Sequence, residues 1–180
     1  DTKLILSQLV DMGATGMADE VTKLPGSHVR LLVFTGLGKK SATYSHETLR
    51  RAAGSASRAL AGNLAATFSL PAKSLAQVAA VAEGAALGAY SFTEFRGSTK
   101  DDHKAPLKTI TVHSKLAATP EAKASVVRAA IIAKYTYLVR DLINTPPSHL
   151  TPESFCTAIS AAVKKAGGAA AGLKVTVMTD

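Results

Sequence analysis

The sequence lacks Trp and is poor in aromatic residues, which make up 5% of its 180 residues. Because large aromatic side chains often anchor a core, this scarcity predicts a core of Val, Ile and Leu packed closely with small residues. The apolar fraction of 47% and the charged fraction of 19% are ordinary for a globular protein. The length suits one domain together with the start of a second.

Cysteine is almost absent, since Cys156 is the only one. No disulfide can form within the chain, which favours a reducing compartment, and we expect the protein to be cytoplasmic. The sequence also lacks a signal peptide and any apolar run of about 18 residues, so we expect neither export nor membrane insertion. Because the chain begins at Asp1 rather than at Met, we expect the protein to start further upstream.

Acidic residues are too few to balance the basic ones. There are 21 Lys and Arg residues against 13 Asp and Glu residues, a formal net charge of +8. Such an excess attracts acidic partners, including nucleic acid. However, the chain has no long run of like charges and few aromatic residues for base stacking. The pattern favours a solvated basic surface, with DNA binding as the alternative.

Familiar catalytic motifs are missing as well. The sequence has neither an HExxH pair nor a GxSxG elbow, and one thiol cannot form a thiolate zinc site. His103 lies in a polar loop where weak metal binding is conceivable, but a solvated loop is favoured. We interpret His149 as a packing or surface residue and Cys156 as a small buried side chain on a helix. We therefore predict no catalytic residue and no metal ligand in this chain.

One glycine-rich turn is a candidate anion site. Gly36, Gly38 and Lys39 follow an apolar run, and backbone N–H groups after a strand can bind anions. The spacing fits neither common phosphate motif, because Val33 stands where a Walker glycine is needed and Ser41 where the dinucleotide fingerprint needs its third glycine. A structural turn is favoured, and anion binding stays open.

The remaining pattern predicts alternating strands and helices, and hence the α/β class. Strands are expected over residues 29–35, 64–70, 109–112 and 173–178, the first buried on both faces of a parallel or mixed sheet. Helices are expected over residues 45–62, 74–90, 120–143 and 151–167. The second helix should offer a smooth face of small residues, Ala76, Ala80, Gly84 and Gly88. The third should bury an apolar stripe of Val127, Ile131, Tyr135, Leu138 and Leu142.

Paired prolines divide the chain. Pro146 and Pro147 cannot continue a helix and mark a rigid connector over residues 145–150. Thr151, followed by Pro152 and Glu153, then suits the start of a new helix. We therefore predict an α/β domain over residues 1–144, incomplete at its start, and the first helix and strand of a second α/β domain over residues 151–180. Such a pair cannot bury both of its apolar faces alone.

The segment RDLINTPPSHLTPE, residues 140–153, resembles the interdomain connector of leucyl (cytosol) aminopeptidases, a family of two-metal metallopeptidases. Upstream pieces agree in order, namely GLGK at residues 36–39, LRRAAG at residues 49–54 and the stretch from Gly84 to Tyr90 before Phe92. The LKV segment at residues 173–175 also has the right place. One departure is Ser148, where family members often have Asn.

The resemblance implies an architecture and an assembly. The amino-terminal domain of this family is similar to macro domains, in which helices sandwich a mixed sheet, and the parent protein is a homo-hexamer. The connector residues take structural roles, and they are Arg140, Asp141, Asn144, Pro146, Pro147 and Thr151.

The resemblance also implies a chemistry that lies outside this chain. In the parent protein two divalent metal ions, Mn or Zn, activate a water that attacks the amino-terminal peptide bond of a peptide substrate. The motifs that carry those ligands, of the NTDAEGR kind, are absent here. The 180-residue portion is thus expected to be inactive alone and to support folding and assembly. The alternatives are a stand-alone macro-like module that binds a nucleotide near Gly36, and a basic DNA-binding module with salt-dependent affinity.

Overall fold

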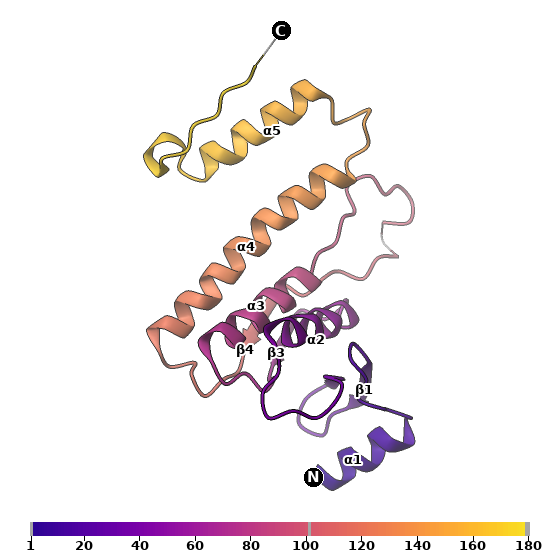
Figure 1. Ribbon diagram of the computed structural model, residues 1–180. Helices are drawn as coiled ribbons and strands as arrows, with labels where there is room; N and C mark the ends of the chain where they lie inside the picture. The colour runs from indigo at the N-terminus through magenta and orange to yellow at the C-terminus, as the bar shows by residue number, and fades with distance from the viewer. Residues whose placement is uncertain (1, 101, 179–180) are drawn as a thin grey trace. The chain divides into compact units, whose positions relative to one another are not determined.

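The computed structural model describes residues 2–100 and 102–178 of the chain (Figure 1). Helices and strands alternate along it, so the predicted α/β class is confirmed. The chain divides into two compact units, Asp1–Tyr137 and Leu138–Asp180, and each is described by itself. The predicted domain limits around the connector stay predictions.

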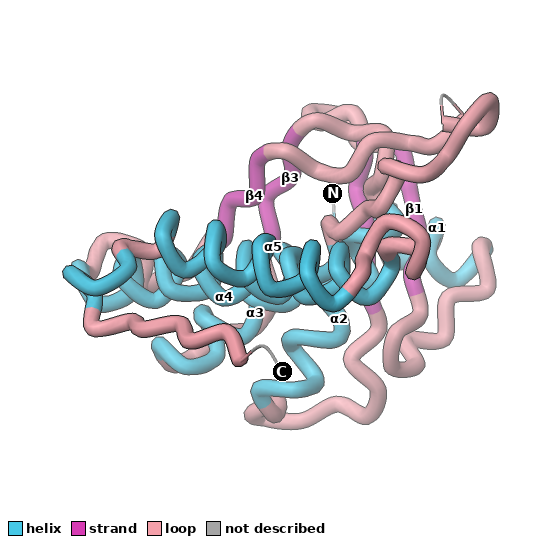
Figure 2. The backbone as a smooth tube through the Cα atoms, turned by 90° about the horizontal axis from the view of Figure 1, so that it is seen from above, coloured by secondary structure: helices cyan, strands magenta, loops and turns pink. Residues whose placement is uncertain are grey.

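The strands of the first unit form two pairs. In one pair β1 (Val21–Pro25) runs antiparallel to β2 (Leu31–Thr35), and in the other β3 (Ala65–Phe68) runs parallel to β4 (Thr109–Val112). Figure 2 shows β3 and β4 side by side. The three strands predicted in this unit are present, β2 and β3 in shorter form. Strand β1 was not predicted, and Leu24 is its one buried residue.

The predicted burial of the first strand on both faces is wrong. All five residues of β2 are half-buried, and Val29 just before the strand is 52% exposed. Its partner in the described residues is β1, so β2 lies in a two-stranded ribbon rather than in the centre of a wide sheet. A continuous apolar run shows a tendency to be buried, but the number of neighbouring strands decides how far burial goes.

Two capped helices form the centre of the first unit. Helix α2 (His46–Ala59) begins after Ser45, whose side chain accepts a hydrogen bond from the Thr48 N–H at 3.0 Å. Helix α3 (Leu75–Gly88) begins after Ser74, which accepts one from the Gln77 N–H at 3.3 Å. These caps satisfy N–H groups that have no partner inside the helix. Helix α2 was expected to extend to residue 62, two residues beyond the observed C-cap, Leu60.

Small residues let α2 and α3 approach each other closely. Ala80, Gly84 and Gly88 are buried, as the predicted smooth face requires, while Ala76 at the start of α3 is exposed. A Cβ atom added to Gly84 would lie 2.0 Å from the backbone oxygen of Arg50, far inside van der Waals contact. The two backbones therefore touch at this crossing, and glycine is required there.

The core combines this helix pair with the neighbouring strands. Its buried members are mainly aliphatic and small, and Phe68 is the one aromatic residue among those described: Leu49, Ala53, Ala56, Leu60, Phe68, Val81, Ala85, Ala89 and Leu107. An aliphatic, small-residue core is what the scarcity of aromatic residues predicts. The packing depends on close approach rather than on large side chains.

An arginine joins the two helices at the edge of this core. The Arg50 guanidinium donates to Glu47 at 2.6 Å within α2 and to Glu83 at 3.0 Å and 3.1 Å across to α3. Desolvation alone would lower the pKa of Arg50, but the hydrogen bonds and charges of the two carboxylates together raise that pKa above its ordinary value. Arg50 thus stays charged and ties the exposed edge of α2 to α3.

The long helix α4 (Pro120–Asn144) does not bury the predicted stripe. Its buried residues are Ala122, Ala129 and Ala133, whereas Val127 and Ile131 are 60% and 52% exposed. Within the first unit, the Tyr137 hydroxyl donates to the Ala86 carbonyl oxygen, and the Tyr137 and Tyr90 rings lie 5.2 Å apart. The buried positions of α4 are thus alanines, and the contact that it makes with α3 through Tyr137 is a single aromatic side chain.

Helix α1 (Thr2–Asp11), which was not predicted, belongs to the first unit and buries none of its described residues. The second unit contains the end of α4, the connector, α5 (Pro152–Lys165) and the short 3-10 helix η1 (Gly168–Ala171). The predicted start of α5 is confirmed, since Thr151 and Ser154 form a reciprocal capping box.

The predicted strand over residues 173–178 is not formed. These residues have no assigned secondary structure, and Leu173, Val175 and Val177 are 43%, 39% and 47% exposed. A strand is stabilised by hydrogen bonds to a neighbouring strand, and the described part of the chain pairs none with this segment. The predicted strand is wrong for the described chain, because the segment has no strand beside it.

Candidate functional site

The predicted anion-binding turn, residues 36–39, is hydrogen-bonded to the loop over residues 13–20. The Gly36 N–H donates to the Glu20 carbonyl oxygen at 2.8 Å, and the Gly38 N–H donates to the Gly16 carbonyl oxygen at 2.9 Å. A Cβ atom on Gly36 would lie 1.8 Å from the Met17 carbonyl oxygen. An anion at this turn would have to compete with two internal hydrogen bonds. The contacts support the structural turn, and anion binding by Gly36, Gly38 and the exposed Lys39 stays a prediction.

The side chain of Glu20 organises the same loop. Its carboxylate accepts hydrogen bonds from the Thr15 N–H at 3.0 Å, the Thr15 hydroxyl at 2.7 Å and the Met17 N–H at 3.0 Å. The hydrogen bond from the Thr15 backbone is the main cause that lowers the pKa of Glu20 below its ordinary value. Beside it, Asp19 has a φ of +68° and forms an ion pair with Arg51 on α2. The carboxylates of Glu20 and Asp19 therefore hold the loop against the glycine turn, each through its own partners.

Replacing Glu20 by glutamine is expected to lower the thermal unfolding midpoint at pH 7. A carboxyl group whose pKa is lower in the folded protein than in the unfolded chain adds stability above the unfolded value, and this stability is lost as the pH falls through the folded pKa. The difference between wild type and variant should therefore shrink as the pH falls below the ordinary pKa of 4.5. Circular dichroism melts at pH 7 and at successive lower pH values measure this.

Glu94→Gln is the control for this series, because Glu94 is an exposed glutamate in another loop of the same unit. Its difference from wild type should stay small at every pH. A Glu20→Gln variant that keeps the same deficit below pH 4 as at pH 7 would show that the carboxylate charge does not stabilise the loop.

The connector residues make local structural contacts. The carbonyl oxygen of Asp141 accepts hydrogen bonds from the Thr145 N–H at 2.9 Å and the Thr145 hydroxyl at 2.7 Å, which ends α4 at Asn144. The Pro146 carbonyl oxygen then accepts from the N–H groups of His149 and Leu150 at 2.9 Å and 3.0 Å. Arg140 and Asp141 are half-buried in the last turns of α4, and Thr151 caps α5.

Histidine, cysteine and carboxylate side chains do not gather into a metal site within the described residues. His113 pairs with Ser69 at 3.2 Å, and His149 is exposed and pairs with Ser148 at 3.0 Å. Cys156 is half-buried on α5 rather than buried as predicted, because the described unit places little against that face of the helix. Over residues 2–100 and 102–178, none of the helices is both long and apolar enough to cross a membrane.

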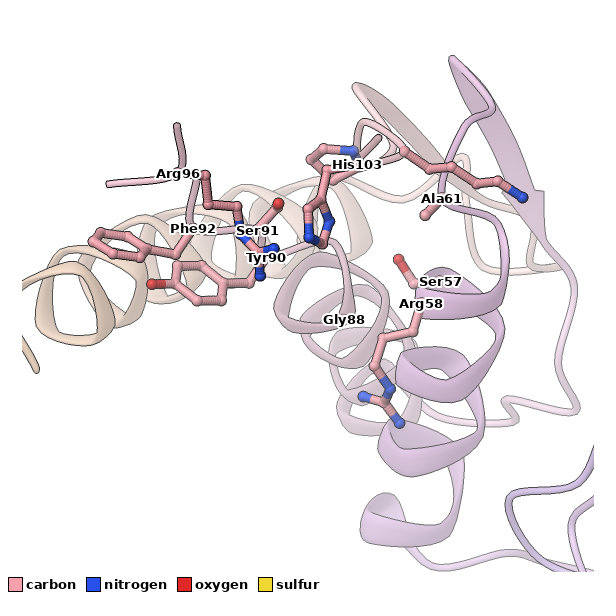
Figure 3. A pocket seen from close by; sticks show the side chains of 11 residues that line it. Ser57, Arg58, Ala61, Gly88, Tyr90, Ser91, Phe92, Arg96 and His103 are labelled. Atoms are coloured by element: carbon pink, nitrogen blue, oxygen red, sulfur yellow. The ribbon is translucent and has the colours of Figure 1, made fainter. Parts of the chain in front are cut away.

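A cavity of about 270 Å³ lies where α2 and α3 end, under the loop over residues 91–106 (Figure 3). Its lining combines basic, aromatic and small residues: Ser57, Arg58, Ala61, Gly88, Tyr90, Ser91, Phe92, Arg96, His103, Lys104 and Pro106. The sequence placed His103 in a solvated loop, and its side chain is exposed, yet it lines this cavity. Sequence reasoning missed the site because its residues come from three separate segments without a common spacing.

Comparison with known proteins identifies the family. The sequence profile of the cytosol aminopeptidase family, N-terminal domain, matches residues 2–99, more than half of the chain. The chain belongs to the cytosol aminopeptidase family. The family predicted from the connector and the upstream segments is thereby confirmed. Named relatives and solved structures show how much of the chain is similar.

Relatives of the cytosol aminopeptidase family match nearly the whole chain. A probable cytosol aminopeptidase of Streptomyces griseus subsp. griseus is 41% identical over 96% of this chain and 36% of its own length. One of Streptomyces avermitilis is 40% identical over 96% of this chain and 35% of its own length. The chain thus spans about a third of the length of the curated relatives that it matches.

Solved structures agree with this family. The bottromycin maturation enzyme BotP in complex with Mn is 29% identical, with a TM-score of 0.72, over 89% of this chain and 34% of that chain. A mutant of tomato leucine aminopeptidase has a TM-score of 0.77 over 90% of this chain and 32% of that chain. Its identity of 18% supports the fold alone.

Proposed function

We propose that this chain is the non-catalytic, amino-terminal portion of an aminopeptidase that releases amino-terminal residues from peptides. The observation that carries the proposal is the match of residues 2–99 to the N-terminal domain of the cytosol aminopeptidase family. Relatives at about 40% identity are named probable cytosol aminopeptidases, and the chain spans about a third of each. These names also support a cytoplasmic location for the whole protein.

Exposed apolar side chains of α4 support a role in folding and assembly. Val127 and Ile131, one turn apart on α4 in the first unit, are 60% and 52% exposed. Contiguous apolar surface on a folded unit marks a site of contact with another part or partner. We propose that the catalytic portion of the parent protein covers this face, because relatives contain about twice as much further chain as is present here.

The unpaired segment over residues 173–178 supports the same proposal from the second unit. Leu173, Val175 and Val177 alternate along it and are each partly exposed. Alternation with a period of two is the pattern of a strand with one buried face. We propose that it pairs with strands of the catalytic portion, and that six copies of the parent protein assemble as a homo-hexamer.

The metal ions of the reaction belong outside this chain in our proposal. Two divalent ions need several carboxylate or other ligands held close together, and the described residues form no such group. The residues that the structure describes therefore do not fit a resident metal site. BotP is described as a complex with Mn, so Mn is the first ion to test with the full-length protein, and Zn the second.

The full-length protein that contains this chain is expected to hydrolyse leucyl-p-nitroanilide when Mn is added, whereas the 180-residue chain is expected to show no hydrolysis above background. Both samples are assayed at equal molar concentration with Mn and with Zn, and light scattering gives the mass of each assembly. The physical reason is that the described residues hold neither a metal ligand group nor a familiar catalytic motif.

Three results would each contradict a part of the proposal. Hydrolysis by the 180-residue chain, removed by a chelator, would show that it contains a catalytic metal site of its own. A full-length protein that is folded and inactive with both metals would reject the aminopeptidase function. An assembly mass that differs from the mass of six copies would reject the hexamer, whereas the aminopeptidase function would still be judged by the hydrolysis assay.

A further inference from the structure

The geometry points to a binding site for a small phosphate monoester in the cavity at the ends of α2 and α3, with the phosphate near Ser57 and Arg96 and a planar or apolar body against Tyr90 and Phe92. This inference concerns residues 57–106 alone and does not depend on the proposed peptidase function. The cavity of about 270 Å³ suits a small ligand rather than a macromolecule.

The hydroxyl group of Ser57 is the first observation. Ser57 is 1% exposed, and its Oγ atom is buried without a hydrogen-bond partner among the described residues. A buried polar atom in that state lowers stability, and most such atoms in native proteins have a protein or water partner. Figure 3 shows the hydroxyl pointing toward the space between His103 and Gly88. A ligand oxygen in the cavity would satisfy it.

Charge is the second observation. Three cationic residues line the cavity, Arg58, Arg96 and Lys104, and none of the described lining residues is acidic. The ends of α2 and α3 each contribute about −0.5 of an elementary charge, so the lining keeps an excess of about +2. A phosphate monoester carries about −1.5 to −2 at neutral pH and matches this excess, whereas a carboxylate carries only −1.

The cations differ in how free they are to bind. The Arg58 guanidinium donates to the Ser55 hydroxyl at 3.0 Å, so it is partly engaged along α2. Arg96 comes from the loop that follows α3 and lines the cavity together with Tyr90 and Phe92 (Figure 3). A planar guanidinium can donate two parallel hydrogen bonds to phosphate oxygens, which makes Arg96 the main candidate contact.

The aromatic wall is the third observation. Tyr90 and Phe92 are half-buried and line the same cavity. Each ring is held by a second one, since Tyr90 lies 5.2 Å from Tyr137 and Phe92 lies 5.8 Å from Phe95. Gly88 also lines the cavity, and a Cβ atom added there would lie 2.9 Å from the Ser57 Cβ atom and 2.4 Å from the Gly54 carbonyl oxygen. A flat or apolar ligand body would pack against these rings and bury its surface there.

Isothermal titration calorimetry of the 180-residue chain with phenyl phosphate tests the site, in a low-salt buffer without phosphate. Phenyl phosphate is expected to bind, benzoate to bind about tenfold more weakly because its charge is lower, and inorganic phosphate more weakly because it lacks a ring. Absence of heat and of chemical-shift changes with millimolar phenyl phosphate would overturn the inference. So would equal binding of benzoate.

Single substitutions test which residues of the cavity contact the ligand. Arg96→Gln is expected to weaken phenyl phosphate binding about tenfold, while Arg128→Gln, the same change on exposed α4, should alter it less than about twofold. Ser57→Ala should weaken binding several-fold without lowering the unfolding midpoint, because it removes a buried hydroxyl that has no partner. Equal losses in both arginine variants would show a non-specific surface effect and reject the site. Unchanged binding by Ser57→Ala would reject the contact at the cavity floor.

Discussion

Replacing Gly84 by alanine is expected to lower the free energy of unfolding of this chain by about 3 kcal/mol. The added Cβ atom would lie 2.0 Å from the Arg50 carbonyl oxygen and 2.7 Å from the Arg50 carbonyl carbon. Both are backbone atoms inside α2, so no side-chain rotation relieves the overlap and the two helices must move apart. Separation removes contacts across the most tightly packed part of the core. Urea unfolding at 25 °C measures the change.

Gly54→Ala is the matched control, since Gly54 lies on α2 at the same interface. Its added Cβ atom would lie 3.3 Å from the Gly84 carbonyl oxygen, which a small shift accommodates. Alanine also favours the helix by about 0.5–1 kcal/mol relative to glycine, so the net change should stay within about 1 kcal/mol. Similar losses in both variants would contradict the idea that backbone contact at Gly84 sets the spacing of the helices.

Replacing Ile131 by glutamate is expected to have little effect on the 180-residue chain and a large effect on the full-length protein. In this chain Ile131 is 52% exposed, and surface substitutions usually change stability by less than about 0.5 kcal/mol. In the parent protein we propose that the catalytic portion covers this face of α4. A carboxylate buried there without a partner would cost about 3 kcal/mol or more.

Thermal unfolding and leucyl-p-nitroanilide hydrolysis of both lengths of chain measure this contrast. Lys123→Glu is the control, because it introduces the same side chain at another exposed position of α4. It should leave the full-length protein active and its unfolding midpoint nearly unchanged. An Ile131→Glu variant with wild-type midpoint and activity in the full-length protein would show that the exposed α4 face stays open to solvent.

Local patterns were read well from the sequence. The first residues of three expected helices, Ser45, Ser74 and Thr151, are the N-caps of α2, α3 and α5. The parallel strand at residues 109–112 has the predicted bounds, and paired prolines follow the end of α4. Each of these features depends on hydrogen bonds or dihedral angles within a few residues, so the information is contained in a short window.

Periodicity was less reliable for burial. Val127 and Ile131 have the spacing of a buried stripe, yet Ala129 and Ala133 are the residues that α4 buries. A hydrophobic stripe shows which face prefers to leave water, while the partner nearest in space and its closest approach decide which face meets the core. A helix can have one apolar face that meets its own core and another that contacts a different part of the protein. The apolar pattern alone does not distinguish these two faces.

The sequence by itself determined the α/β class, the starts of helices α2 to α5, the small-residue face of α3 and the family, because propensity, capping and motif order are properties of neighbouring residues. Only the tertiary structure decided that α4 buries Ala122, Ala129 and Ala133, that residues 173–178 stay unpaired and that one cavity is lined by Ser57, Arg96 and His103. These features join residues far apart in the chain. Their contacts depend on how whole elements pack, and no short window of sequence contains that information.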